Sequence, residues 1–202
     1  ITQKGYLKRY RPPRQVARPS VGKETDPERD FCLANMHDSV LFLTDTGRVC
    51  QARCHELPEA DRSARGLPVG NLITLEGKEQ VVSIMPVPRD APAGCSLAIV
   101  TRGGKVKRVA ISEFSTVHGG GVAAMSLDTG DVPVAARLSR GQDEFVLVTR
   151  QGQAIRFAQD EVRVMGRSAG GVAAVRLEGT AGGVAAFDLA RPKTDLLVLT
   201  AQ

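Results

Sequence analysis

Lysine and arginine side chains recur just after glycine-containing turns, and their chemistry would be the electrostatic binding of an anion. The candidates are Lys8, Arg9, Arg48, Arg53, Lys105, Lys107, Arg108 and Arg156, and Arg163 and Arg167 flank a further loop. Basic side chains at intervals fit a polyanion with repeated phosphates, because each neutralised phosphate releases a condensed counterion. The alternative for any one of them is a place on the solvated face of a strand.

The charge of the chain is concentrated at its start. Residues 1–24 carry a net charge of +6, with Glu24 as the one acidic side chain, whereas the whole chain carries +5. The remaining residues therefore sum to −1, and a basic segment on a nearly neutral body indicates a focused anionic partner, nucleic acid first. The alternative is a disordered linker whose charges only solvate it. Four further cations of this segment join the candidates: Arg11, Arg14, Arg18 and Lys23.

Other reactive side chains do not form a catalytic pattern. Cys50 and Cys54 lie along one strand with no second cysteine pair, so we expect buried, reduced thiols and no metal site. His37 and His118 have no nucleophile in a suitable motif, which excludes a hydrolytic triad. The glycines of 102–105 lack the spacing of a phosphate-binding loop. We predict no catalytic centre and no cofactor.

A repeated hairpin positions the cations. An aliphatic strand ending in Thr, a polar turn with Gly and a second, basic strand recur with Thr at positions 2, 44, 101, 149 and 200, about 50 residues apart. The four- to five-residue apolar runs predict strands buried on both faces, and each turn glycine predicts a positive φ. Residues 196–200 open a fifth copy.

A glycine-rich signature follows each hairpin and completes the repeat. Residues 119–127 match residues 169–177, a longer variant covers 65–75, and each is followed by a turn and another short aliphatic strand. Each unit thus offers about four short strands, which is typical of a propeller blade. With 21 Gly, 11 Pro and only 4% aromatic residues, the composition also favours an all-β protein. The only helical turn that we expect is at 112–114.

The sequence resembles the carboxyl-terminal domain of the bacterial DNA gyrase A protein over essentially the whole chain. The resemblance rests on Asn35 to Asp38, on residues 56–60 with Arg65 and Gly66, on 111–114, and most specifically on 154–157 followed by 161–167. It implies a β-pinwheel, a propeller-like disc of roughly four to five four-stranded blades that exchange strands. Residues 1–202 would form a single domain or a fragment of one, with residues 10–30 as a basic, proline-containing loop after the first hairpin.

The resemblance also implies function and partners. The domain would bind duplex DNA without sequence specificity and wrap it around a basic outer rim. It would present this DNA to the rest of the gyrase A protein of a type IIA topoisomerase, whose other component is an ATPase. Tyr6 and Tyr10 are not the cleaving tyrosine, which the family carries in its amino-terminal region. We therefore expect a non-catalytic, monomeric domain in the cytoplasm, associated with the nucleoid and not with a membrane.

One departure from the family pattern leaves an alternative open. Gyrases carry a basic box, Gln-x-x-Gly-Gly-Lys-Gly, in the loop after the first hairpin. Here the stretch 15–23 keeps only Gln15 and the pair Gly22 and Lys23, and Pro19 stiffens it. The alternatives are a DNA-bending domain like that of topoisomerase IV, without chiral wrapping, and a propeller that binds a protein partner.

Overall fold

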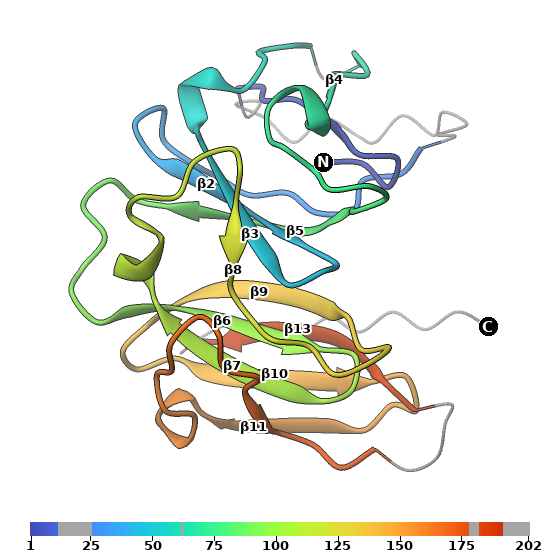
Figure 1. Cartoon of the computed structure of the whole chain (residues 1–202), viewed down its shortest axis with the longest axis vertical. Coiled ribbons are helices and arrows are strands. Elements are labelled where there is room, and N and C mark those ends of the chain that lie inside the picture. The colour runs from blue at the N-terminus through green and yellow to red at the C-terminus, as the bar shows by residue number, and fades with distance from the viewer. Residues whose placement is uncertain (12–25, 62, 178–181, 192–202) are drawn as a thin grey trace.

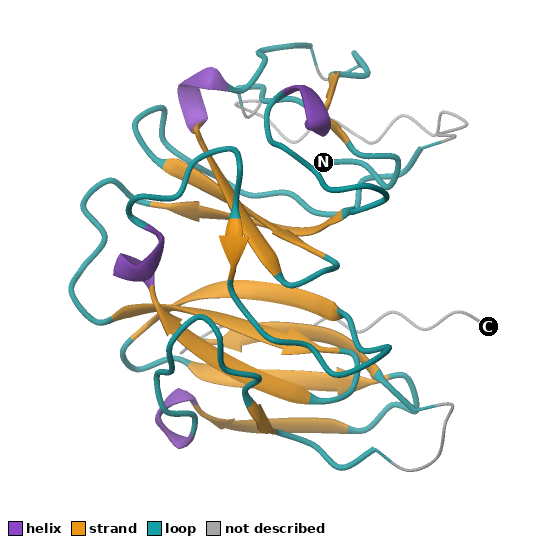
Figure 2. Cartoon of the chain, viewed as in Figure 1, coloured by secondary structure: helices purple, strands orange, loops and turns teal. Residues whose placement is uncertain are grey.

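A computed structural model of the chain describes residues 1–11, 26–61, 63–177 and 182–191. These residues form short strands and loops with four single-turn 3₁₀ helices: η1 (Cys54–Glu56), η2 (Val69–Asn71), η3 (Ile111–Phe114) and η4 (Gln159–Glu161) (Figure 2). The turn expected at 112–114 is confirmed by η3, whereas η1, η2 and η4 were not predicted from the sequence. Among the described residues no helix has the length and apolar character needed to cross a membrane.

Three antiparallel hairpins are the repeated unit expected from the sequence. Strand β2 (Ser39–Thr44) pairs with β3 (Arg48–Arg53), β6 (Cys95–Thr101) with β7 (Lys105–Ala110), and β10 (Glu144–Thr149) with β11 (Ala154–Ala158). The turn glycines Gly47, Gly104 and Gly152 have φ values of 78°, 84° and 80°, which confirms the predicted positive φ.

The recurring threonine has a structural role in these turns. The hydroxyl oxygens of Thr44, Thr101 and Thr149 accept a hydrogen bond from the amide four residues later, at 3.2, 3.2 and 3.1 Å. Each side chain therefore satisfies a donor at the point where the hairpin closes. This interaction explains why Thr, and not another β-branched residue, ends each apolar run.

A third strand lies on the inner side of each hairpin. Strands β5 (Val81–Val87), β9 (Pro133–Arg140) and β13 (Val184–Ala190) pair antiparallel with β2, β6 and β10. The register shifts at the same place in all three pairs, just before Thr44, Thr101 and Thr149. The three sheets therefore share the position of this register shift as well as the order of their strands.

In the first three sheets the outermost strand comes from the following repeat, whereas the outermost described strand of the fourth sheet is β11 of its own hairpin. Strand β8 (Val122–Ala123) follows the β6–β7 hairpin but pairs with β3, and β12 (Val172–Ala173) follows β10–β11 but pairs with β7. Likewise β4 (Leu67–Pro68) pairs with β1 (Tyr6–Leu7). The sheet orders are β1-β4, β5-β2-β3-β8, β12-β7-β6-β9 and β11-β10-β13. This exchange of strands confirms the all-β pinwheel.

Apolar clusters fill the spaces between consecutive sheets. Leu41 and Met85 pack with Leu97 and Ile99 between the second and third sheets, and Val100 packs in a cluster with Phe145 and Phe187 between the third and fourth. A third cluster joins the first two sheets. In Figure 1 the sheets follow one another along the long axis, with β4 near one end and β11 near the other. The fifth repeat expected at 196–200 lies outside the described residues.

Glycine is required where an exchanged strand enters its host sheet. At Gly171, just before β12, φ is +81° and an added Cβ would lie 2.6 Å from the carbonyl oxygen of Val106. Gly121, before β8, has φ of +67° and would place a Cβ 2.6 Å from the sulfur of Cys50. The glycine-rich signature thus permits close approach of the two backbones.

Replacing Gly171 with alanine tests this requirement. Gly152→Ala is the control, because its φ is +80° but no heavy atom lies within 4 Å of the added Cβ. The control carries only the strain of a left-handed backbone, about 1–2 kcal/mol. We expect Gly171→Ala to lower the free energy of unfolding by a further ~1–3 kcal/mol, because the clash adds to the strain. Urea unfolding followed by circular dichroism measures both, and equal losses would contradict the close approach.

Candidate nucleic-acid interface

Lys107 is buried inside the molecule, although the sequence pattern predicts it to be an exposed cation. Its side chain is 0% exposed, and its ammonium group donates to the carbonyl oxygens of Ala124, Arg167 and Ala169 at 2.7, 2.6 and 2.8 Å. Ala124 follows the exchanged strand β8, and residues 167 and 169 precede the exchanged strand β12. Lys107 therefore forms hydrogen bonds with two exchanged segments at once. We expected it to contact DNA, but its buried position gives it a structural role instead.

Burial also changes the titration of this group. Desolvation lowers the pKa of Lys107 from 10.5 to about 8, because no carboxylate accompanies the charge into the interior. Three carbonyl acceptors take the place of water around the ammonium group.

Arg108 and Arg48 are also held by internal partners. Arg108 is 6% exposed, and its guanidinium donates to the carbonyl oxygens of Gln159 and Val162 at 2.8 and 3.0 Å. Arg48 pairs with the buried carboxylate of Glu79 at 2.7 Å and donates to the carbonyl of Gly120 at 2.5 Å. We therefore remove Arg108 from the set of expected DNA contacts, since its donors are used inside the fold, whereas Arg48 is 15% exposed and also pairs with the exposed Glu76 at 3.1 Å.

Hydrogen bonding keeps the partner of Arg48 ionised. Burial alone would raise the pKa of Glu79, but hydrogen bonds from Thr44 and Thr46, together with the charge of Arg48, lower it below its ordinary value. The pair is thus a fixed internal feature of the β2–β3 turn.

The remaining candidates lie on the surface of outer strands and loops. Arg53 ends β3, Arg156 lies on β11, and Arg163 is in the loop between η4 and β12; all three are exposed. Arg156 pairs with Glu144, whereas no ion pair involves Arg53 or Arg163 within the described part of the chain. Exposed guanidinium groups of this kind can reach phosphates without disturbing the fold.

Two further candidates are half-buried and paired with carboxylates. The ammonium of Lys105 lies 2.6 Å from Asp128, and the guanidinium of Arg167 lies 3.5 Å from Glu113. Because the carboxylates are about half exposed or more, at 63% and 47%, these pairs are screened by water and can open toward another anion.

Two cations of the first repeat form hydrogen bonds with residues 57–64. Lys8 donates to the carbonyl of Ala64 at 2.6 Å, and Arg9 donates to the carbonyl of Leu57 at 2.8 Å and pairs with Glu59 at 2.6 Å. Arg11 is exposed. The candidates Arg14, Arg18 and Lys23, with the box at 15–23 and most of the loop at 10–30, lie outside the described residues.

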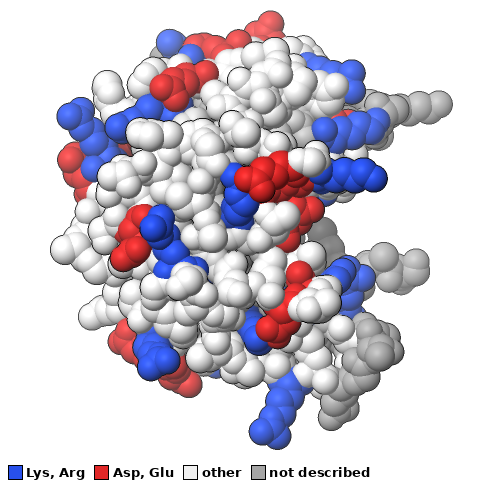
Figure 3. All heavy atoms as spheres, in the orientation of Figure 1, with Lys and Arg blue, Asp and Glu red and all other residues white. Residues whose placement is uncertain are grey.

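The charges on the visible face do not merge into one basic belt. Figure 3 shows lysine and arginine side chains interspersed with aspartate and glutamate. Several exposed arginines were not among the candidates, and Arg102, Arg150 and Arg176 are examples. Arg102 and Arg150 directly follow the anchor threonines, so the turn position before the glycine is the sequence signal that would have found them.

The cysteines belong to the interior. Cys50 and Cys54 are buried, as expected, and all four cysteines carry free thiols. Burial raises the pKa of Cys32 to about 11 and also raises the pKa values of Cys50 and Cys54. Protonated thiols are poor nucleophiles and poor metal ligands, and the described residues hold no cluster of three metal-ligating side chains.

Comparison with known proteins identifies relatives of this fold. Residues 38–88, 96–138 and 143–189 match the family model described as the DNA gyrase C-terminal domain, beta-propeller. The chain is 39% identical to the DNA gyrase A protein of Salmonella typhimurium over 157 residues, 78% of this chain and 18% of that protein. It is 37% identical to the DNA gyrase A protein of Mycolicibacterium smegmatis, over 99% of this chain and 25% of that one.

Solved structures share the architecture. The C-terminal domain of a DNA topoisomerase IV superposes with a TM-score of 0.75 at 25% identity, over 96% of this chain and 60% of that chain. The E. coli ParC C-terminal domain gives a TM-score of 0.70 at 16% identity, over 94% of this chain and 77% of that one. The chain therefore spans a quarter or less of these gyrase proteins and more than half of the solved domains.

Replacing Lys107 with methionine tests its structural role. Near neutral pH we expect Lys107→Met to lower the free energy of unfolding by about 1–3 kcal/mol, because buried carbonyls lose their donor. The unfolded chain keeps this proton up to a pKa of 10.5, whereas the folded chain loses it near 8, so the unfolded state binds more protons between these values. As the pH rises from about 8 to 10.5, the free energy of unfolding of the wild-type chain therefore increases relative to that of the variant. A pH-independent difference would contradict the buried ammonium.

Proposed function

The chain belongs to the family of DNA gyrase C-terminal domains, and on that premise we propose that it binds duplex DNA without sequence specificity and bends it around its outer strands. The observation that carries this proposal is the placement of exposed arginines on the outer parts of consecutive sheets. Arg53 belongs to the second sheet, Arg163 lies in the loop that passes β7 of the third, and Arg156 lies on β11 of the fourth.

Contacts spread over several sheets suit a bent duplex. Bending 20–30 base pairs by 40–90° costs on the order of 1–6 kcal/mol, so several simultaneous phosphate contacts are needed to offset it. Phosphate contacts fix the position of the duplex but carry little base information. Sequence preference would then arise from the bendability of the DNA.

The wider role that we propose is that of a non-catalytic domain in an ATP-dependent type IIA topoisomerase. The chain would present bent DNA to the breakage and reunion region of a gyrase A protein, and the further partner would be the ATPase component of the enzyme. It would work in the cytoplasm, on the nucleoid. Gyrase-like supercoiling is the activity that the sequence relatives favour.

A second candidate function is bending without handedness, by a domain of the topoisomerase IV kind. Two observations favour it: the box at 15–23 departs from the gyrase pattern, and the body outside residues 1–24 carries a net charge of −1. Binding to relaxed circular DNA, followed by relaxation, separates the two. A change in linking number supports gyrase-like wrapping, and no change supports bending alone.

Affinity measured against salt and duplex length tests the DNA interface. We expect affinity to rise with length and to fall steeply with salt. A plot of log affinity against log salt concentration has a negative slope. Replacing both Arg156 and Arg163 with glutamine is expected to make this slope less negative by about 2, because each phosphate contact contributes ~0.9 to its magnitude. Arg89→Gln, at an exposed position in the β5–β6 loop, is the control for loss of charge.

Two results would contradict the proposal. An unchanged slope in the double variant would show that these arginines do not contact phosphates. Weak binding that does not depend on length in the wild-type chain would favour a propeller that recruits a protein partner.

A further inference from the structure

The inner strands of consecutive sheets lie side by side without backbone pairing. Strand β9 packs against both β5 and β13, although the three strands belong to three different sheets. Between the sheets lie apolar clusters, and the hydrophobic attraction that holds them together is non-directional. Directional contacts at the edges of the sheets therefore contribute to the angle between neighbouring sheets.

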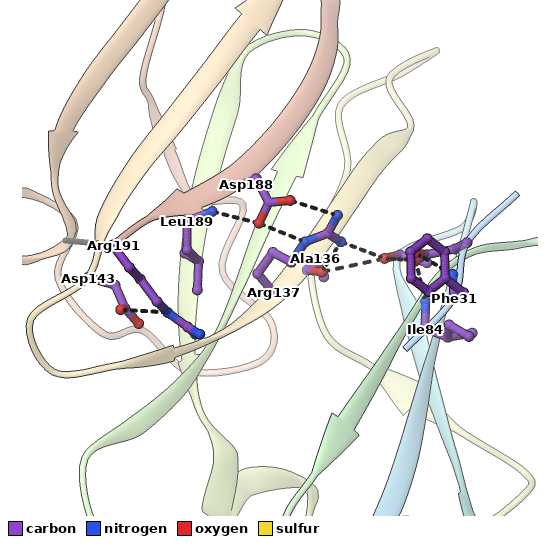
Figure 4. A network of polar contacts seen from close by, with 10 residues as sticks. Phe31, Ile84, Ala136, Arg137, Asp143, Asp188, Leu189 and Arg191 are labelled. Atoms are coloured by element: carbon purple, nitrogen blue, oxygen red, sulfur yellow. Dashed lines mark hydrogen bonds and ion pairs between the residues drawn. The ribbon is translucent and has the colours of Figure 1, made fainter. Parts of the chain in front are cut away.

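At the outer edge these contacts come from the exchanged strands, and at the inner edge they come from a chain of polar side chains. Asp30, Ser83, Arg137 and Asp188 form this inner relay (Figure 4). Asp30 accepts hydrogen bonds from the hydroxyl of Ser83 at 2.8 Å and from the amide of Ile84 at 3.0 Å. The relay thus begins in the segment before β2 and continues onto β5.

Arg137 joins the two neighbouring sheets to its own. One guanidinium nitrogen lies 3.4 Å from the hydroxyl of Ser83 on β5, and Nε lies 3.2 Å from the carboxylate of Asp188 on β13. The same guanidinium donates to the carbonyl of Ala136 at 2.9 Å, which holds its orientation. A single side chain on β9 therefore contacts the inner strand on either side.

The repeat places opposite charges at equivalent positions. Arg137 is opposite Ala98 on its neighbouring strand, and Asp188 is opposite Val146 at the same register of the next sheet. In the second sheet this register is occupied by Met85, opposite Leu41. The pair is thus a specific feature of the third and fourth sheets and not a general property of the repeat.

We propose that Arg137 is a positioning residue that sets the angle between consecutive sheets and thereby the curvature of the outer surface on which DNA bends. This inference rests on the proposed function. The inner relay draws the inner edges of the sheets together, which fans their outer edges apart and increases the curvature. Without Arg137 the inner edges separate and the outer surface becomes flatter.

Ser83 is buried, but the ion pair between Arg137 and Asp188 is partly exposed, and this exposure distinguishes a role in positioning from a role in stability. The side chains of Arg137 and Asp188 are 30% and 62% exposed, and the relay borders a cavity of about 520 Å³. Partly exposed ion pairs add little to stability and are screened by salt. Loss of the relay therefore changes the angle between sheets more than it changes the melting temperature.

The experiment measures DNA bending and protein shape in the 202-residue chain with Arg137→Met, which keeps the aliphatic stem and removes the donors. Cyclisation of a bound duplex reports the bend, small-angle X-ray scattering of the protein alone reports its curvature, and thermal unfolding reports stability. Arg89→Met is the control for loss of one exposed charge. The charge swap of Arg137→Asp with Asp188→Arg restores the ion pair with β13 in reversed polarity, but it does not restore the contact with Ser83 on β5.

The expected result is a flatter protein that binds DNA but bends it less. For Arg137→Met we expect the radius of gyration to rise and cyclisation to slow by about threefold or more, since bending energy depends on the angle. Affinity stays within about threefold, because phosphate contacts lie elsewhere, and the melting temperature moves by less than about 4 °C. The charge swap restores part of the lost cyclisation rate and part of the change in radius of gyration, because it restores the ion pair with β13 alone, and Arg89→Met changes neither quantity.

Unchanged cyclisation and scattering in Arg137→Met would overturn the inference, as would a charge swap that restores neither. A fall in melting temperature well beyond the stated range would assign Arg137 an ordinary structural role and would also overturn it. Failure of the wild-type chain to bind DNA would refute the proposed function instead. In that case the scattering comparison alone still decides whether Arg137 sets the angle between sheets.

Discussion

The exchange of outer strands between repeats is the constraint on which the rest of this structure depends. Strands β8 and β12 each leave their own repeat to complete the sheet before it, so neither sheet is finished by its own hairpin. The exchange requires close backbone contact, which the glycines at 121 and 171 permit. It also brings polar backbone groups into the interior, where they need partners. Several basic side chains are used to provide those partners.

Some lysine and arginine side chains form hydrogen bonds inside the fold, so they do not contribute to the charge on the surface of this family member. Lys107, Arg108 and Arg48 satisfy backbone carbonyls near turns and exchanged segments, and the donors of Lys107 and Arg108 face inward. Charge counted along the sequence therefore overstates the charge available to DNA in the described sheets. The surface that remains is built from fewer arginines on outer strands, and it favours distributed contacts with a long, curved duplex over a tight local site.

The sequence predicted the periodic features well. The threonine-ended apolar runs and the turn glycines have local causes, such as strand burial and positive φ, that can be recognised from neighbouring residues. The helical turn at 112–114 was also predicted, but the turns η1, η2 and η4 were not. The cations were predicted less well. Lys105 and Lys107 lie two residues apart on one strand and therefore on the same face, yet Lys105 is partly exposed and Lys107 is fully buried beneath the segments at 124 and 167–169.

By itself the sequence determined the repeat, the all-β class and the membership of the gyrase domain family, because hydrophobic period and turn chemistry are local properties of the chain. Only the tertiary structure decided which strand completes which sheet, which cations remain exposed and how Arg137 meets Asp188. These outcomes depend on contacts between residues about 50 positions apart. Such contacts arise when repeats stack, and no single repeat contains both partners.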